Sequence, residues 1–190
     1  MDRMTTRPSP ADAPGVRVRD MEPGDCDAVA EIRVRGWQPA YAGLVPQAYL
    51  DAMDVAREAE LRRRTFAAGG PQVHAVSLAA DSAVTGWACY GPCRDAGAPS
   101  GRGELYALYV HPERIGTGAG RALLSELTAR AATAGFHEMA LWVLRDNTRA
   151  RRFYERAGFL PDGAEESSET GGAAVPEVRY VRTLSGPAAG

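Results

Sequence analysis

The sequence predicts an α/β layered fold, in which a mixed sheet carries helices on both faces. Segments with strand character alternate with segments of helical period along the chain, which is the pattern of layered α/β architectures. Two apolar strands, Glu104–Val110 and Met139–Leu144, are separated by a glycine-rich turn and a helical stretch. Because a helix crossover joins them, we expect these two strands to be central and parallel.

Length and charge limit the classes of function. A chain of 190 residues predicts one domain, which we place at residues 16–184, between a disordered tail at residues 1–15 and a short tail at residues 185–190. The net charge of −2 gives no electrostatic case for nucleic acid or an anionic membrane as a partner. The chain contains no Lys, which excludes a Schiff-base or phosphate-loop lysine.

The cysteines Cys26, Cys89 and Cys93 are too few, and odd in number, for a disulfide framework. The spacing of Cys89 and Cys93 would suit a metal, but no second ligand pair is nearby, so we favour free thiols and expect no metal.

No apolar run reaches the ~20 residues of a membrane span, and the N-terminal residues lack the hydrophobic centre of a signal peptide. We therefore expect a cytoplasmic protein.

The first half of the chain predicts a strand, two helical regions and a strand pair. Alternation at Val16–Arg19 indicates the strand, and the apolar face of Ala28, Val29 and Ile32 indicates the first helix. The predicted elements are a strand at 16–19, a helix from 22 to about 36, an aromatic connector at 37–46, a helical region at 49–68 broken near 54, and strands at 73–78 and 83–90.

The second half predicts the central strands and their helices. Leu124, Leu127 and Ala131 form an apolar stripe, and Gly135 is a natural end for that helix. The unbroken apolar run of Met139–Leu144 indicates a strand covered on both faces. The predicted elements are a polar loop at 91–103, a strand at 104–110, a helix at 118–134, a strand at 139–144, a helix at 146–158, a strand starting at 159, an acidic loop at 163–172 and a closing strand at 178–184.

The turn at Gly116, Gly118 and Gly120 lies between the central strand and its helix. Glycines there let backbone N–H groups approach a ligand without obstruction by Cβ, and a helix N-terminus favours phosphate. The alternative is a glycine-rich turn that serves only close packing. A phosphate-loop NTPase is excluded because no Lys is present, and a dinucleotide-binding Rossmann turn is disfavoured because Arg121 stands at the third glycine position.

The segment Val110–Leu124 resembles the acetyl-CoA signature V-x-P-x-x-[RQ]-G-x-G-x-[GA] of the GCN5-related N-acetyltransferase (GNAT) superfamily. Asn147–Phe159 resembles the family's second element, N-x-x-A-x-x-[FL]-Y-x-x-x-G-F, and residues 28–50 are similar to the N-terminal region of one bacterial branch. The likeness covers residues 16–184. One departure is Ile115, where the family usually has Arg or Gln, so that either Arg114 or Arg121 is a candidate to assist the pyrophosphate.

The resemblance implies the GNAT fold, a mostly antiparallel sheet whose central parallel strands splay apart around acetyl-CoA. It implies that the pantetheine arm pairs with backbone groups of a bulged central strand and that Asn147 contacts the arm or a nearby water. N-capping of the helix is the plain alternative for Asn147. The residues expected to bind acetyl-CoA are Leu108, Tyr109, Val110, Ile115, Gly116, Thr117, Gly118, Ala119, Gly120, Arg121, Asn147 and Tyr154.

Two residues are predicted to be catalytic. Tyr154 matches the family tyrosine that protonates the departing thiolate, and a phenol is a donor at neutral pH; alternatively, it only packs in its apolar stripe. Glu104 stands at the usual position of the carboxylate base, often acting through water; a solvent-exposed carboxylate at a strand end is the alternative. His111 is a further candidate for the base.

Trp37 and Tyr41 follow the first helix, and family architecture places that region over the acceptor site, although core packing is an alternative.

The expected function is transfer of an acetyl group to a primary amine of a small molecule or peptide in a ternary complex, without an acyl-enzyme. A non-catalytic acyl-CoA sensor on the same fold is the second hypothesis. The resemblance also allows a homodimer.

Overall fold

The computed structural model describes residues 15–184. The predicted tails, apart from Gly15, lie outside the described residues. The strands form one seven-stranded sheet in the order β1-β2-β3-β4-β5-β7-β6. All neighbouring strands are antiparallel except β4 and β5, which are parallel, as a helix crossover between them requires. The predicted mixed, mostly antiparallel sheet is therefore confirmed.

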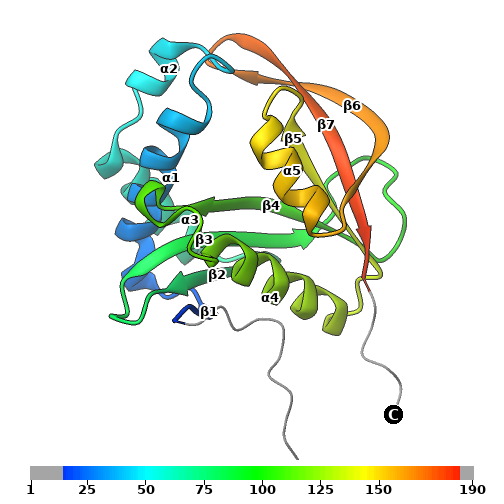
Figure 1. Ribbon diagram of the computed structural model, residues 1–190, viewed down its shortest axis with the longest axis horizontal. Helices are drawn as coiled ribbons and strands as arrows, with labels where there is room; N and C mark the ends of the chain where they lie inside the picture. Colours follow the sequence, from blue (N-terminus) through cyan, green and yellow to red (C-terminus); the bar gives the residue numbers. More distant parts are fainter. Residues whose placement is uncertain (1–14, 185–190) are drawn as a thin grey trace, which may run out of the picture.

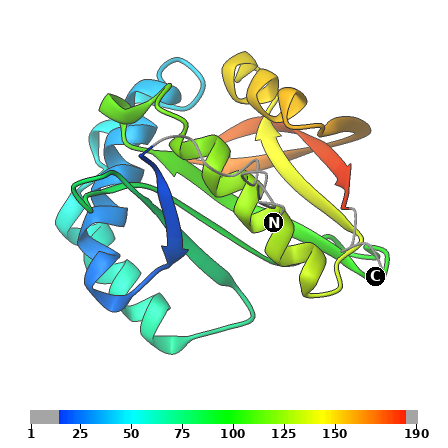
Figure 2. The same cartoon turned by 60° about the horizontal axis from the view of Figure 1, so that its bottom comes forward.

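The helices lie on both faces of the sheet, as predicted (Figures 1 and 2). The apolar stripe of α4 and one face of α5 pack on one side, and α1 to α3 pack on the other. The elements are β1 (Arg17–Asp20), α1 (Cys26–Ala40), α2 (Gln47–Asp51), α3 (Val55–Ala68), β2 (Val73–Leu78), β3 (Val84–Pro92), β4 (Arg102–Val110), α4 (Ala119–Thr133), β5 (Glu138–Leu144), α5 (Thr148–Arg156), β6 (Leu160–Thr170) and β7 (Ala173–Thr183). Short 3-10 turns at Pro23–Asp25 and Pro112–Arg114 precede α1 and α4.

The break predicted near Asp54 is confirmed. Helix α2 ends at Asp51, and the Asp54 side chain caps α3 by accepting a hydrogen bond from the Arg57 amide at 2.8 Å. An aspartate in this position satisfies one of the N–H groups that a helix start leaves unpaired.

Helix α1 is longer than predicted. It continues past Gly36 and includes Trp37 and Pro39, which we had assigned to the connector. Pro39 cannot donate to the carbonyl of Arg35, and the helix ends one residue later, at Ala40. The amide of Tyr41, the C-terminal cap, donates to the Trp37 carbonyl at 2.9 Å. The extension fixes Trp37 to a rigid element.

The predicted acidic loop at residues 163–172 is wrong. Residues 160–170 form strand β6, which pairs with β7 in a long hairpin whose tip is at Gly171 and Gly172. The Glu- and Ser-rich composition, typical of a loop, suits this strand because it is the last of the sheet and mostly exposed. The hairpin tip reaches α2, where Gly171 contacts Tyr49 (Figure 1).

Candidate active site

The central strands β4 and β5 part within the sheet. They pair only from Arg102 opposite Glu138 to Glu104 opposite Ala140, although β4 continues to Val110 and β5 to Leu144. On its other edge β4 carries an extra residue, because Cys89 of β3 is opposite Ala107 and Tyr90 is opposite Leu105. The bulge and the parting leave the facing backbone edges of both strands available to a ligand.

The glycine turn ends beside the far end of β4. Gly116 and Gly118 adopt positive φ, +87° and +96°, and Gly118 is the N-terminal cap of α4. Within residues 15–184 the turn leaves a set of backbone N–H groups without an acceptor, namely those of Gly116, Gly118, Ala119, Gly120 and Arg121. Together with the helix dipole, such converging amides favour a bound phosphate.

Two amides of the predicted set are not available. The N–H groups of Ile115 and Thr117 donate to the carbonyls of Pro112 and Arg114, each at 3.3 Å. The Thr117 hydroxyl donates to the same Arg114 carbonyl at 2.7 Å. These bonds shape the turn, so Ile115 and Thr117 support the site by holding the glycines in position.

Gly120 has a packing role as well. A Cβ atom there would lie 3.3 Å from Val110 and 3.6 Å from Phe153, which belongs to α5. The absence of a side chain thus lets α4 approach both β4 and α5. The interpretation that the turn serves close packing is therefore correct for Gly120. Gly116 and Gly118 require glycine for a different reason, because other residues rarely adopt their positive φ.

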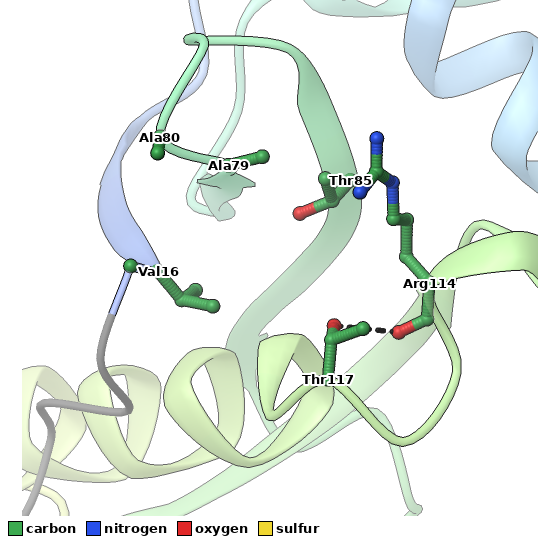
Figure 3. A pocket seen from close by; sticks show the side chains of 7 residues that line it. Val16, Ala79, Ala80, Thr85, Arg114 and Thr117 are labelled. Carbon is green, nitrogen blue, oxygen red and sulfur yellow. Dashed lines mark hydrogen bonds between the residues drawn. The ribbon is translucent and has the colours of Figure 1, made fainter.

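Arg114 borders a cavity of about 200 Å³ beside the turn (Figure 3). The cavity lies toward β1 and β3, between Val16, Ala79 and Thr85, and not between β4 and β5. Figure 3 shows the Arg114 guanidinium extending past Thr85, away from Thr117. Of the two arginines considered for the pyrophosphate, Arg121 is thus the one that lies on α4 at the free amides.

Helix α5 begins beside the end of β5. The Asn147 side chain accepts a hydrogen bond from the Ala150 amide at 3.1 Å, so its N-capping role is confirmed. Tyr154 packs against Phe153 and Phe159, with ring centroids 5.1 and 6.0 Å away. Its phenol forms no hydrogen bond within the described chain, and burial, with a smaller effect of Tyr109, raises the Tyr154 pKa above its usual value.

The side chains of Trp37, Tyr41, Tyr49 and Tyr109 form one aromatic cluster on the α1 side of the sheet. The Trp37 ring centroid lies 4.5 Å from that of Tyr41, 6.1 Å from that of Tyr49 and 6.3 Å from that of Tyr109. Burial raises the pKa of Tyr41, with further contributions from Tyr109, Tyr154 and Glu177. The structure therefore brings the two predicted acceptor residues, Trp37 and Tyr41, together beside Tyr109 of β4.

Glu104 lies at the point where β4 and β5 part, and it is buried, with 1% of its surface exposed. The solvent-exposed alternative is therefore wrong. Its carboxylate accepts hydrogen bonds from the Arg94 amide at 2.9 Å and from Arg94 Nε at 3.1 Å. Glu104 precedes Tyr109 by five positions in the strand, or about 16 Å along an extended backbone, so Glu104 lies toward the opposite end of β4 from Tyr109. His111 accepts from the Glu113 amide at 3.3 Å.

A polar network beside Glu104 was not found from the sequence. Asp95, in the loop after β3, accepts hydrogen bonds from Trp142 Nε1 at 3.0 Å and from Arg179 at 2.6 Å. Burial opposes ionisation, but these donors outweigh it and lower the pKa of Asp95. The partners are far apart in sequence, and only the pairing of Trp142 with Arg179 in β5 and β7 shows that they share a face.

Cys93, Asp95 and Glu104 bring one potential ligand atom each within 4.8 Å of one another. The carboxylates already accept from Arg179 and Arg94, and burial raises the pKa of the Cys93 thiol. Carboxylates that are already paired with arginine side chains, and a thiol that stays protonated, make this group a poor metal site. Cys89 is a buried free thiol whose pKa burial raises to about 12, so its predicted spacing with Cys93 does not produce a pair of thiolates.

Comparison with known proteins identifies the protein family to which the parted strands and the glycine turn belong. The acetyltransferase (GNAT) family matches residues 34–159. An uncharacterized N-acetyltransferase of Bacillus subtilis (strain 168), YuaI, is 32% identical over 166 residues, which cover 86% of this chain and 90% of YuaI. The chain therefore belongs to the GNAT acetyltransferase family, and the predicted enzyme class, an acyltransferase, is confirmed.

Other relatives match a shorter part of the chain. The mycothiol acetyltransferase of Geodermatophilus obscurus is 40% identical over 81 residues, 43% of this chain and 26% of that protein.

Among solved structures, a phosphinothricin acetyltransferase from Sinorhizobium meliloti in complex with AcCoA has a TM-score of 0.68 at 26% identity, covering 93% of this chain and 92% of its own. PaiA N-acetyltransferase from Thermoplasma acidophilum, in complex with coenzyme A, has a TM-score of 0.64 at 20% identity, with 88% and 98% covered.

Across residues 15–184, no helix combines the length and the apolar character that crossing a membrane would need.

Proposed function

We propose that this chain transfers the acetyl group of acetyl-CoA directly to a primary amine within a ternary complex, and that residues 16–184 make up the catalytic unit. The observation that carries the proposal is the set of unpaired amides, of Gly116 and of residues 118–121, beside the parted edge of β4. A diphosphate requires several N–H donors, and a pantetheine arm requires a free backbone edge. The two features adjoin at Val110, as the two parts of one acyl-CoA require.

The residues have distinct roles in this proposal. The amides at the start of α4 and Arg121 bind the diphosphate, and the backbone of Leu108, Tyr109 and Val110 pairs with the pantetheine arm. One N–H of that segment polarises the thioester carbonyl, a type of stabilisation that contributes about 3 kcal/mol per donor. Complexes of the structural neighbours with CoA or AcCoA support this choice of co-substrate.

Tyr154 protonates the departing thiolate. A phenol is protonated at neutral pH and can therefore donate a proton, as a general acid must. Glu104 takes the proton of the amine through intervening water, because its distance along β4 leaves no direct contact with the amine at Tyr154. The new amide bond forms as the thioester carbon–sulfur bond breaks, and free CoA leaves.

Two measurements test the proposal together. Calorimetry with acetyl-CoA should show saturable binding, and a panel of primary amines should release free thiol only when both substrates are present. Binding without thiol release for any amine would support a non-catalytic acyl-CoA sensor instead. Absence of binding would overturn the assignment of the glycine turn.

A further inference from the structure

Glu177 lies on the same side of the sheet as the aromatic cluster of Trp37, Tyr41, Tyr49 and Tyr109. In register, it is directly opposite Leu144 of β5. Directly opposed side chains of paired strands share a face, and so do alternate residues of one strand. Leu144, and Val175 two positions before Glu177, belong to the buried group against which Trp37 and Tyr41 pack, so Glu177 lies on the face that carries the cluster.

This carboxylate has no cation of its own. Within residues 15–184 no Arg or His side chain lies within ion-pair distance of Glu177, and Arg94, whose charge reaches it, is bound to Glu104. Across the hairpin Glu177 is opposite another carboxylate, Glu166, and such a like-charged pair is destabilising. Burial, with a smaller effect of Glu166, raises the Glu177 pKa against the opposing effects of Ser168 and Arg94.

The aromatic cluster supplies the other half of this environment, because Trp37, Tyr41 and Tyr49 pack on the face that Glu177 shares. The rings of Trp37 and Tyr41 lie 4.5 Å apart, and burial is the main cause of the raised pKa of Tyr41, with a smaller effect of Glu177. Aromatic faces close to a carboxylate form an environment that favours an organic cation.

We propose that Glu177 binds a second positive charge of the acceptor, so that the preferred substrate is a polycationic amine. One amine reaches Tyr154 for acetylation, and a distant ammonium meets Glu177 beyond Tyr41. This inference rests on the proposed function. It excludes α-amino acids as preferred acceptors, because their carboxylate would lie in a region that already holds the carboxylates of Glu177 and Glu166 without a cation.

The test compares butane-1,4-diamine with butylamine, which has the same carbon chain and only one amine. The wild-type kcat/KM should favour the diamine at least about tenfold, the effect of one charge-assisted contact. Glu177→Gln should remove about that factor for the diamine, mainly through KM, and leave butylamine within about twofold. Glu169→Gln is the matched control, because Glu169 is opposite Ala174 and thus on the other face of the hairpin.

A binding measurement keeps the test independent of catalysis. Calorimetry of butane-1,4-diamine with CoA-loaded protein should show a Kd about tenfold higher in Glu177→Gln than in wild type or Glu169→Gln. Equal effects of Glu177→Gln on both amines, no effect on either, or preferred use of an α-amino acid would overturn the inference. If no amine releases thiol, the proposed function fails, and diamine binding still decides the role of Glu177.

Discussion

Tyr154 shows how much a single phenol depends on its surroundings. It belongs to the apolar face of α5, as the sequence period indicates, and within the described chain its hydroxyl forms no hydrogen bond. The packing role and the proposed catalytic role are therefore compatible, because the ring packs in the core while its hydroxyl is not engaged by another residue.

We predict that Tyr154→Phe lowers kcat by about a hundredfold, the lower end of what a positioned general acid contributes. The affinity for acetyl-CoA should stay within about twofold, because the ring and its packing remain. Thiol-release kinetics give kcat, and calorimetry gives the affinity. An unchanged kcat would remove Tyr154 from the reaction and leave it a packing residue.

Gly118 carries a second prediction at this scale. Its φ of +96° is one that side chains with a Cβ rarely adopt, so Gly118→Ala should lower the free energy of unfolding by about 1–2 kcal/mol. It should also weaken acetyl-CoA binding, because relief of the strain moves the free amides. Gly24→Ala is the control, since Gly24 has open space around it and no positive φ. Equal denaturation midpoints for the two variants would contradict the prediction.

The sequence located the glycine turn, Asn147, Tyr154 and Trp37 because each belongs to a short motif or a local period. It could not locate Glu177, because the partners of that residue are defined by strand register across three strands. Nor could it show that Glu104 is buried beneath Arg94, since that contact depends on the path of the loop after β3.

Elements were predicted best where one face of a helix or both faces of a strand are buried. Helix α4 and strand β5 are the clearest examples, and their boundaries agree within one or two residues. The start of β6 was predicted, but its continuation from residue 163 was missed because its exposed residues carry no hydrophobic period. The end of α1 was missed because Gly36 and Pro39 are normally signals that a helix stops.

The junction of β1 with α1 depends on one ion pair, which predicts a response to acid. Asp25 accepts hydrogen bonds from Arg19 at 2.6 and 2.8 Å and from the Glu22 amide at 2.7 Å. Burial alone would raise the pKa of Asp25, but these donors lower it below its ordinary 3.8. The stabilisation is therefore fully present above pH 3.8 and is lost as the pH falls through the folded-state pKa.

Asp25→Asn should accordingly cost about 1–3 kcal/mol at neutral pH and flatten the loss of stability in acid. Urea unfolding between pH 2 and 7, followed by circular dichroism, measures both. Asp27→Asn is the control, because its side chain is 76% exposed and its ion pair with Arg63 lies at the surface. Parallel pH curves for wild type and Asp25→Asn would show that the pair does not contribute in this way.

At the scale of the whole molecule, the proposed function implies that acetyl-CoA fills the gap between the parted strands. Acetyl-CoA at one hundred times its Kd should raise the free energy of unfolding by about 2.7 kcal/mol, provided that only the folded state binds. Thermal unfolding with and without acetyl-CoA checks this, with adenosine as a control that lacks the diphosphate and the arm. An equal shift with adenosine would place the binding energy outside the parted strands.

The sheet order places β7 between β5 and β6, although β7 follows both along the chain. Among the described strands, β6 pairs only with β7, and Tyr180 of β7 also anchors α5 by donating to Glu155 at 2.8 Å. On the ribosome, a nascent chain that has emerged as far as Gly172 thus has an open β5 edge, a solitary β6 and an untethered α5. The sheet is therefore complete only after β7 has entered between β5 and β6, the last pairing that the described chain makes.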